Sequence, residues 1–184
     1  MPKFRACSRV GGEGEDGDVM LRLRPPQVSD EAAVLASQRE LAAEDFPFAF
    51  LRPDQSFVDF VRTVEDNRHG RSIEDGWVES TWLVADVGGE VVGRSSVRFA
   101  LNDYLLAEAG HIGYAVRPGC RRRGYATEIL RQSLVVARAG GVADVLVTCD
   151  DTNVGSAKAI EANGGVLENI VDIDGVRLRR YWIP

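Results

Sequence analysis

The chain has 184 residues, of which 45% are hydrophobic and 27% charged, and its formal net charge is −6. These values are typical of a soluble globular protein and argue against non-specific nucleic-acid binding, which needs a basic surface. Three cysteines are too few for a disulfide framework and the two histidines are far apart, so we expect no metal site. No apolar run is long enough to span a membrane and no signal peptide is evident, which predicts a cytoplasmic protein that does not bind membranes.

The first 19 residues contain a glycine-rich, acidic run at 11–18. Such a run cannot bury apolar surface, so we expect a disordered lead over residues 1–19. Met20 stands just before the first predicted strand, and we expect one folded domain over residues 20–184. The same position raises the alternative that Met20, and not Met1, begins the functional protein.

Strand-like and helix-like patterns alternate along the rest of the chain. Gly88-Gly89 and Asp174-Gly175 indicate two hairpins, and Gly140-Gly141 ends a strongly periodic helix. The order is β-α-α-β-β-β-α-β-α-β-β, which predicts an α/β (α+β) fold with a mixed, mostly antiparallel central sheet and helices on both faces. The predicted strands are 21–23, 81–87, 91–101, 112–116, 145–149, 166–173 and 176–183, the predicted helices are 31–43, 54–67, 125–139 and 153–163, and 68–79 and 102–110 are predicted loops.

A basic, glycine-containing turn, Arg121-x-x-Gly124-x-Ala126, lies between a predicted strand and a predicted helix. The free N–H groups at the start of a helix and the helix dipole favour an anion. Gly124 and Ala126 would let a pyrophosphate approach the backbone, and the neighbouring arginines add positive charge. The alternative is a basic loop whose glycine serves only the geometry of the turn.

The run from His111 to Pro118, followed by this turn, resembles the coenzyme A-binding motif of the GNAT superfamily of N-acetyltransferases. A second block, Asn153-x-x-Ser156 continuing to Gly164, resembles the asparagine-containing helix of the same family. The resemblance covers residues 20–184, and several strings are similar to a bacterial group of predicted acetyltransferases of unassigned substrate. It implies acetyl-CoA as co-substrate, no metal, and direct transfer of an acetyl group to a primary amine of a small molecule or peptide.

The resemblance also implies roles for individual residues. The strand backbone of Tyr114, Ala115 and Val116 would pair with the pantetheine arm, and the Val116 N–H would polarise the thioester carbonyl. Asn153 and Ser156 would contact the cofactor, although capping of the following helix is an alternative for Asn153. The pyrophosphate would be held by Arg121, Arg122, Arg123, Gly124, Tyr125, Ala126 and Thr127.

One position departs from the family pattern. Many members carry a tyrosine seven residues after the asparagine, where it protonates the leaving thiolate, but this chain has Ile160. An aliphatic side chain cannot donate a proton, so the role is vacant or is filled by Tyr181, Tyr125 or Tyr104. The vacancy raises the alternative of an acyl-CoA-binding module with weak or no turnover.

Two further residues are candidates for the acid–base chemistry that amine acetylation needs. His111 has the intrinsic pKa best suited to a base, with capping of a loop as the alternative. Asp150 follows the strand adjacent to the cofactor strand, where a carboxylate could receive a substrate ammonium, with helix capping as the alternative.

A Rossmann-type dinucleotide site is disfavoured because the turn lacks the first glycine of GxGxxG. The Phe46/Phe48/Phe50 cluster is suitably located for an acceptor pocket, with core packing as the alternative. The sequence leaves open whether the protein forms a homodimer.

Overall fold

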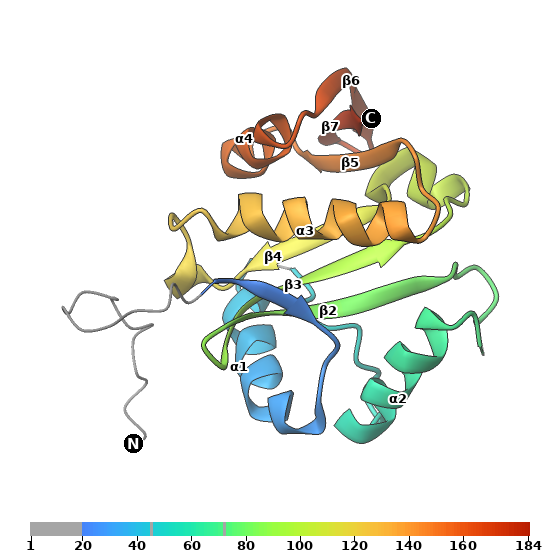
Figure 1. Ribbon diagram of the computed structural model, residues 1–184. Coiled ribbons are helices and arrows are strands. Elements are labelled where there is room, and N and C mark those ends of the chain that lie inside the picture. Colours follow the sequence, from blue (N-terminus) through green and yellow to red (C-terminus); the bar gives the residue numbers. More distant parts are fainter. Residues whose placement is uncertain (1–19, 45, 72) are drawn as a thin grey trace.

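The computed structural model describes residues 20–44, 46–71 and 73–184 (Figure 1). The predicted disordered lead, 1–19, lies outside the described residues. The helices are α1 (Glu31–Ala42), α2 (Phe57–Arg68), α3 (Tyr125–Ala139) and α4 (Val154–Ala162). The strands are β1 (Arg22–Arg24), β2 (Ser80–Val87), β3 (Glu90–Arg98), β4 (Ile112–Val116), β5 (Val145–Asp150), β6 (Val166–Ile173) and β7 (Val176–Ile183).

The described strands form two sheets, and every strand pair within them is antiparallel. One sheet has the order β1-β2-β3-β4 and the other β5-β7-β6. The β2–β3 hairpin turns at Gly88 and Gly89, whose φ angles of 61° and 86° are those that a tight two-residue hairpin requires. The hairpin signal in the sequence therefore gave the correct strand pairing.

Helices cover both faces of the four-stranded sheet. Helices α1 and α2 lie on one face and α3 lies on the other, with α4 packed beyond α3 against β5 (Figure 1). On the first face Phe48, Phe60 and Trp82 pack into one apolar cluster, and on the second Leu130 and Leu134 join a cluster that reaches β5 and β7. The predicted fold class, with a mostly antiparallel sheet and helices on both faces, is confirmed.

His111 joins the two sheets. Its N–H donates to the Leu146 carbonyl at 2.7 Å, and its ring Nδ1 accepts from the Leu146 N–H at 3.0 Å. Beyond this junction β4 and β5 belong to different sheets, so one backbone edge of β4 is left without a strand partner in the described part of the chain. Strands β4 and β5 are therefore joined by hydrogen bonds at one end and separated at the other.

The predicted loop at 102–110 contains an element that the sequence pattern did not indicate. Leu105–Ala109 forms one π-helical turn, and the Asn102 side chain accepts a hydrogen bond from the Leu105 N–H at 2.9 Å. The preceding strand ends at Arg98, and not at residue 101 as predicted. Five residues are too few for a helical period to be visible in the sequence, so this turn had no usable signal.

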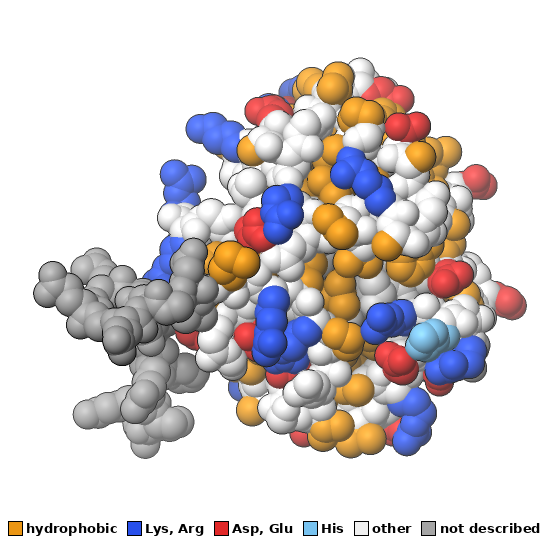
Figure 2. Space-filling view, viewed as in Figure 1, with side chains coloured by type: hydrophobic (Ala, Val, Ile, Leu, Met, Phe, Trp, Pro, Cys, Tyr) orange, Lys and Arg blue, Asp and Glu red, His pale blue; other side chains and the backbone are white. Residues whose placement is uncertain are grey.

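Figure 2 shows that basic and acidic side chains are interspersed on the face it presents, so that face offers no extended basic surface for a nucleic acid. None of the helices described is long and apolar enough to cross a membrane.

Candidate active site

Two cavities meet at the open end of the gap between β4 and β5. The first, here called the turn cavity, has a volume of about 490 Å³ and lies against the turn that precedes α3. The second, here called the aromatic cavity, has a volume of about 650 Å³ and lies between β3, the loop at 46–50 and the π-helical turn. Both cavities are lined by Phe46, Tyr114, Asn153 and Ser156.

The turn cavity faces the start of α3. Gly124 is the residue before the helix and has a φ of 79°, a conformation that side-chain-bearing residues rarely adopt. The first hydrogen bond of the helix runs from the Glu128 N–H to the Gly124 carbonyl, at 3.2 Å. The N–H groups from Gly124 to Thr127 therefore have no partner within the helix. A Cβ built on Gly124 would meet no atom within 4 Å, so the space beside Gly124 is open.

The three arginines of the turn have different surroundings. Arg121 donates from both terminal nitrogens to Glu44, each at 2.8 Å, and from Nε to the Val116 carbonyl at 3.2 Å. Arg122 lines the turn cavity, adopts a φ of 65°, and makes no ion pair with any residue that the structure describes. Arg123 lies on the same turn but does not line either cavity. Of the three, Arg122 is the cation best placed for an anionic ligand.

The free edge of β4 faces the gap between the sheets. The His111 carbonyl and the Arg117 N–H both pair with β3, and the register is regular between them. Because successive residues of a strand direct their backbone groups to opposite sides, Tyr114 and Val116 present theirs toward β5. The backbone of Ala115 pairs with Arg94 instead, and the Ala115 side chain is buried.

The side chains of Tyr114 and Ser156 lie where the two cavities meet. The Tyr114 hydroxyl and the Ser156 hydroxyl are 2.7 Å apart. Burial raises the pKa of Tyr114 to about 12, more than offsetting the hydrogen bond with Ser156, so the phenol is protonated at neutral pH. The motif contained this tyrosine, but the direction of its side chain was not visible in the sequence.

Asn153 makes the local contact that was the alternative to its predicted role, whereas Asp150 bonds to Thr152 and does not cap α4. The Asn153 Oδ1 accepts from the Ser156 N–H at 3.0 Å and so caps α4, while the residue also lines both cavities. Asp150 accepts from the hydroxyl of Thr152 and, at 2.7 Å, from its N–H. These bonds hold the pKa of Asp150 below its usual value, so it lines the aromatic cavity as a carboxylate.

The other two residues predicted to be catalytic, His111 and Tyr181, lie outside both cavities. His111 is buried at the sheet junction, and Tyr181 is 1% exposed, with its hydroxyl donating to Glu161 at 3.0 Å. Ile160 is fully buried in the same core. Tyr125 lines the turn cavity and Tyr104 the aromatic cavity. Catalytic roles for His111, Asp150 and Tyr181 stay predictions.

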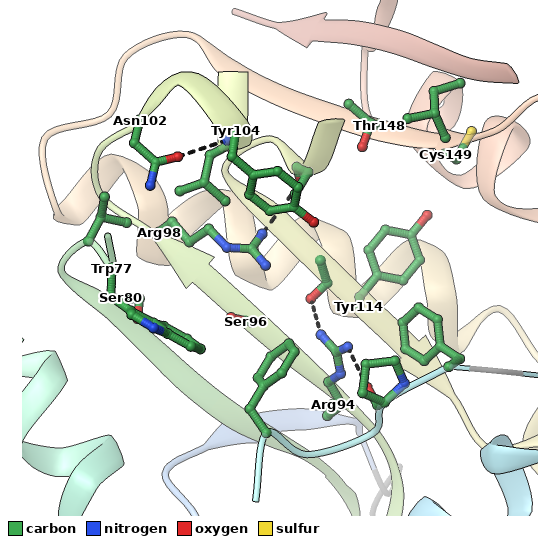
Figure 3. Close-up of a pocket in the computed structure, with 18 of the residues that line it drawn as sticks. Trp77, Ser80, Arg94, Ser96, Arg98, Asn102, Tyr104, Tyr114, Thr148 and Cys149 are labelled. Carbon is green, nitrogen blue, oxygen red and sulfur yellow. Dashed lines mark hydrogen bonds between the residues drawn. The ribbon is translucent and has the colours of Figure 1, made fainter. Parts of the chain in front are cut away.

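The sequence reasoning missed two arginines, Arg94 and Arg98, that line the aromatic cavity (Figure 3). Arg94 is 2% exposed, donates to the carbonyls of Gly113 and Pro47 at 2.9 and 3.0 Å, and lies over the Phe46 ring. Arg98 donates to the Gly110 carbonyl at 3.2 Å. The sequence did contain a signal for these two arginines. Both interrupt a strand of otherwise apolar or small residues, where a buried charge is rare unless it is paired.

Residues 20–166 match the family model described as an acetyltransferase (GNAT) domain. The chain belongs to this family. The protein is therefore an acetyl-CoA-dependent acyltransferase, and the acetyl-CoA co-substrate inferred from the motif is confirmed. Among the described residues no group of three or more His, Cys, Asp or Glu side chains could hold a metal ion.

Solved structures show the same fold at low sequence identity. RimJ of Mycobacterium smegmatis, in complex with a CoA-disulfide, is 19% identical, with 89% of this chain and 81% of that chain covered and a TM-score of 0.66. The yncA protein of Salmonella typhimurium, with acetyl-CoA, is 14% identical, with coverage of 88% and 92% and a TM-score of 0.63. The ribosomal-protein-S5-alanine acetyltransferase of Vibrio fischeri is 16% identical, with coverage of 88% and 91% and a TM-score of 0.63. No curated protein matches the sequence.

Proposed function

We propose that the protein transfers an acetyl group directly from acetyl-CoA to a primary amine of a small molecule or peptide. The cofactor would lie in the turn cavity and along the free edge of β4, and the amine would enter from the aromatic cavity. The observation that carries this proposal is that the two cavities meet at Tyr114 and Ser156. Two ligands could therefore react there while each keeps a separate binding site.

The residues of the turn cavity fit acetyl-CoA. The N–H groups from Gly124 to Thr127 and the dipole of α3 suit a pyrophosphate, and open space lies in front of Gly124. Arg122 and Lys158, which both line this cavity, add positive charge for phosphate groups. The backbone of Tyr114 and Val116 offers donors and acceptors to an extended amide chain, as an exposed sheet edge does for an added strand. When bound, acetyl-CoA supplies an activated acetyl thioester with a thiolate as leaving group.

The remaining chemistry falls to side chains where the cavities meet. The Tyr114 phenol is neutral and can donate a proton or a hydrogen bond to the departing sulfur, the role that Ile160 cannot fill. Ser156 holds the phenol in place at 2.7 Å. Asp150 is ionised and can accept a hydrogen bond from the incoming ammonium, which passes one proton to solvent before the neutral amine attacks. The Val116 N–H, directed toward the gap, can polarise the carbonyl.

Thiol release from acetyl-CoA in the presence of a panel of primary amines tests this function. Turnover that requires an amine supports it. Saturable acetyl-CoA binding with no amine-dependent thiol release would favour the alternative, an acyl-CoA-binding module. Because the departure at Ile160 motivates that alternative, the assay should include the Tyr114→Phe protein, in which the proposed donor is removed as well.

A further inference from the structure

The strand β3 carries a row of polar side chains along one wall of the aromatic cavity. Arg94, Ser96 and Arg98 are at alternate positions, so they point to the same face of the sheet, and all three line the cavity (Figure 3). On the neighbouring strand, Gly113 pairs with Ser96, between the two arginines. The centre of the row therefore faces a residue without a side chain.

The two guanidinium groups converge over Gly113. A Cβ built on this glycine would lie 3.5 Å from Arg94 Nη1 and 3.6 and 3.7 Å from Arg98 Nη1 and Nη2. Two positive charges are thus directed at one small volume that the missing side chain leaves open. Burial lowers the pKa of Arg94, and repulsion from the Arg98 charge lowers it further. Burial also lowers the pKa of Arg98.

No carboxylate of the described residues forms an ion pair with either arginine, although twelve other arginine–carboxylate pairs are found in the same part of the chain. Their hydrogen bonds go to backbone carbonyls, and the fully buried Nε of Arg94 has no partner at all. Buried charges are normally paired, because an uncompensated one is costly. An anion would supply the missing charge.

We propose that the acceptor is an amine that also carries a carboxylate, as an α-amino acid does, and that Arg98 and Arg94 bind this carboxylate over Gly113. The proposal rests on the proposed function, since it names the acceptor of that reaction. Gly113 and Tyr114 both line the aromatic cavity, and Tyr114 also lines the turn cavity, so an amine a few bonds from the carboxylate would reach the place where the two cavities meet. Phe50, Trp77 and Leu105 also line the cavity, which favours an acceptor with an apolar side chain.

A structural role for the arginines is the competing explanation. Arg94 holds the loop at 46–50 by donating a hydrogen bond to the Pro47 carbonyl. Arg98 holds the end of the π-helical turn by donating to the carbonyls of Ala109 and Gly110. Such a role would make their loss destabilising, but it would not make binding depend on the charge of a ligand. The test must therefore measure discrimination between ligands that differ only in that charge.

The experiment measures calorimetric binding of matched amines to the full chain saturated with coenzyme A. The probes are phenylalanine, leucine and methionine, each beside its carboxamide, with the aminophosphonate analogue of phenylalanine as a second anion. We expect the acids to bind about 10- to 100-fold more tightly than the amides, as for a hydrogen bond to a charged group. Arg98→Gln should abolish this ratio and Arg98→Lys should retain part of it. Preference for the phosphonate over the acid would contradict the assignment of a carboxylate.

Gly113→Ala provides a variant that keeps both charges. Its methyl group would make ordinary van der Waals contacts with the guanidiniums, so the protein should fold while the anion is displaced. Gly119→Ala, whose Cβ would meet no atom within 4 Å, is the matched control. Equal affinity for acids and amides, binding of no probe, or a ratio unchanged in Arg98→Gln would overturn the proposal. Thiol release with amines that lack an anion would overturn it while leaving the proposed acetyl transfer intact.

Discussion

The Tyr114 hydroxyl lies 2.7 Å from the Ser156 hydroxyl, and both residues line the two cavities that meet beside β4. The pair joins β4 to the first turn of α4, across the gap between the two sheets. If the Tyr114 phenol assists the departing thiolate, Tyr114→Phe should lower kcat by about 100-fold, as for loss of a general acid. The affinity for coenzyme A should change little, because the backbone of residue 114 is retained.

Tyr181→Phe is the matched control for Tyr114→Phe. It also removes a hydroxyl that is hydrogen-bonded to side chains, those of Glu161 and Arg179, but it lies outside both cavities. We expect an unfolding free energy lower by about 1 kcal/mol and an unchanged kcat. Steady-state kinetics of both variants decide the matter: a kcat loss confined to Tyr181→Phe would assign the proton donor to Tyr181 instead.

His111 should make the stability of the protein dependent on pH. Its Nδ1 accepts from the Leu146 N–H, and burial together with the nearby Arg98 charge lowers its pKa. The neutral ring is therefore favoured by folding. The stabilisation is fully present above the unfolded pKa of about 6.5 and is lost as the pH falls through the lower pKa of the folded protein.

Thermal unfolding between pH 4.5 and 8 measures this effect. His111→Asn can place an amide oxygen near the position of Nδ1, so it should retain the junction and flatten the acid side of the Tm profile relative to the unmodified protein. His111→Leu should be less stable at every pH. If Tm decreases at low pH by the same amount in His111→Asn as in the unmodified protein, other groups cause that decrease.

Arg121 and Arg122 are neighbours in the sequence but should differ in their effect on cofactor affinity. Arg121 is already bound by Glu44, whereas Arg122 lines the turn cavity without an ion-pair partner among the described residues. We expect Arg122→Gln to weaken coenzyme A binding by about 10-fold, with a reduced dependence on salt, and Arg121→Gln to weaken it less. Calorimetry at low and high salt compares them; a larger loss in Arg121→Gln would reverse the assignment.

The sequence predicted most of the fold because its patterns were long and well punctuated. The limits of α3, Tyr125–Ala139, agree with the range predicted from apolar spacing, and the hairpins at Gly88-Gly89 and Asp174-Gly175 are present. The division into two sheets joined at His111 was not predicted, because strand periodicity carries no information on which strands separate. The π-helical turn was missed because its five residues are too few to show a helical period.

For the site, the motif led to the turn before α3 and to β4, but not to the groups that converge on them from other elements. Arg94 and Arg98 belong to a strand that has no motif, and their convergence over Gly113 depends on the register of β3 and β4. Tyr114 was expected to act through its backbone, and its side-chain contact with Ser156 depends on how α4 packs. Contacts between distant segments are set by tertiary packing, which a single sequence does not display.

The most direct test of the central claim, that acetyl-CoA binds at the turn before α3, compares two glycines. Gly124 and Gly175 have φ angles of 79° and 84°, and at each a Cβ would meet no atom within 4 Å. Substitution by alanine should therefore cost each variant a similar amount of stability, about 1–2 kcal/mol. Calorimetric titration with coenzyme A should show an affinity at least about 10-fold lower for Gly124→Ala and unchanged for Gly175→Ala, as for loss of charge-assisted hydrogen bonds. Equal affinities in the two folded variants would contradict the assignment of the turn as the pyrophosphate site.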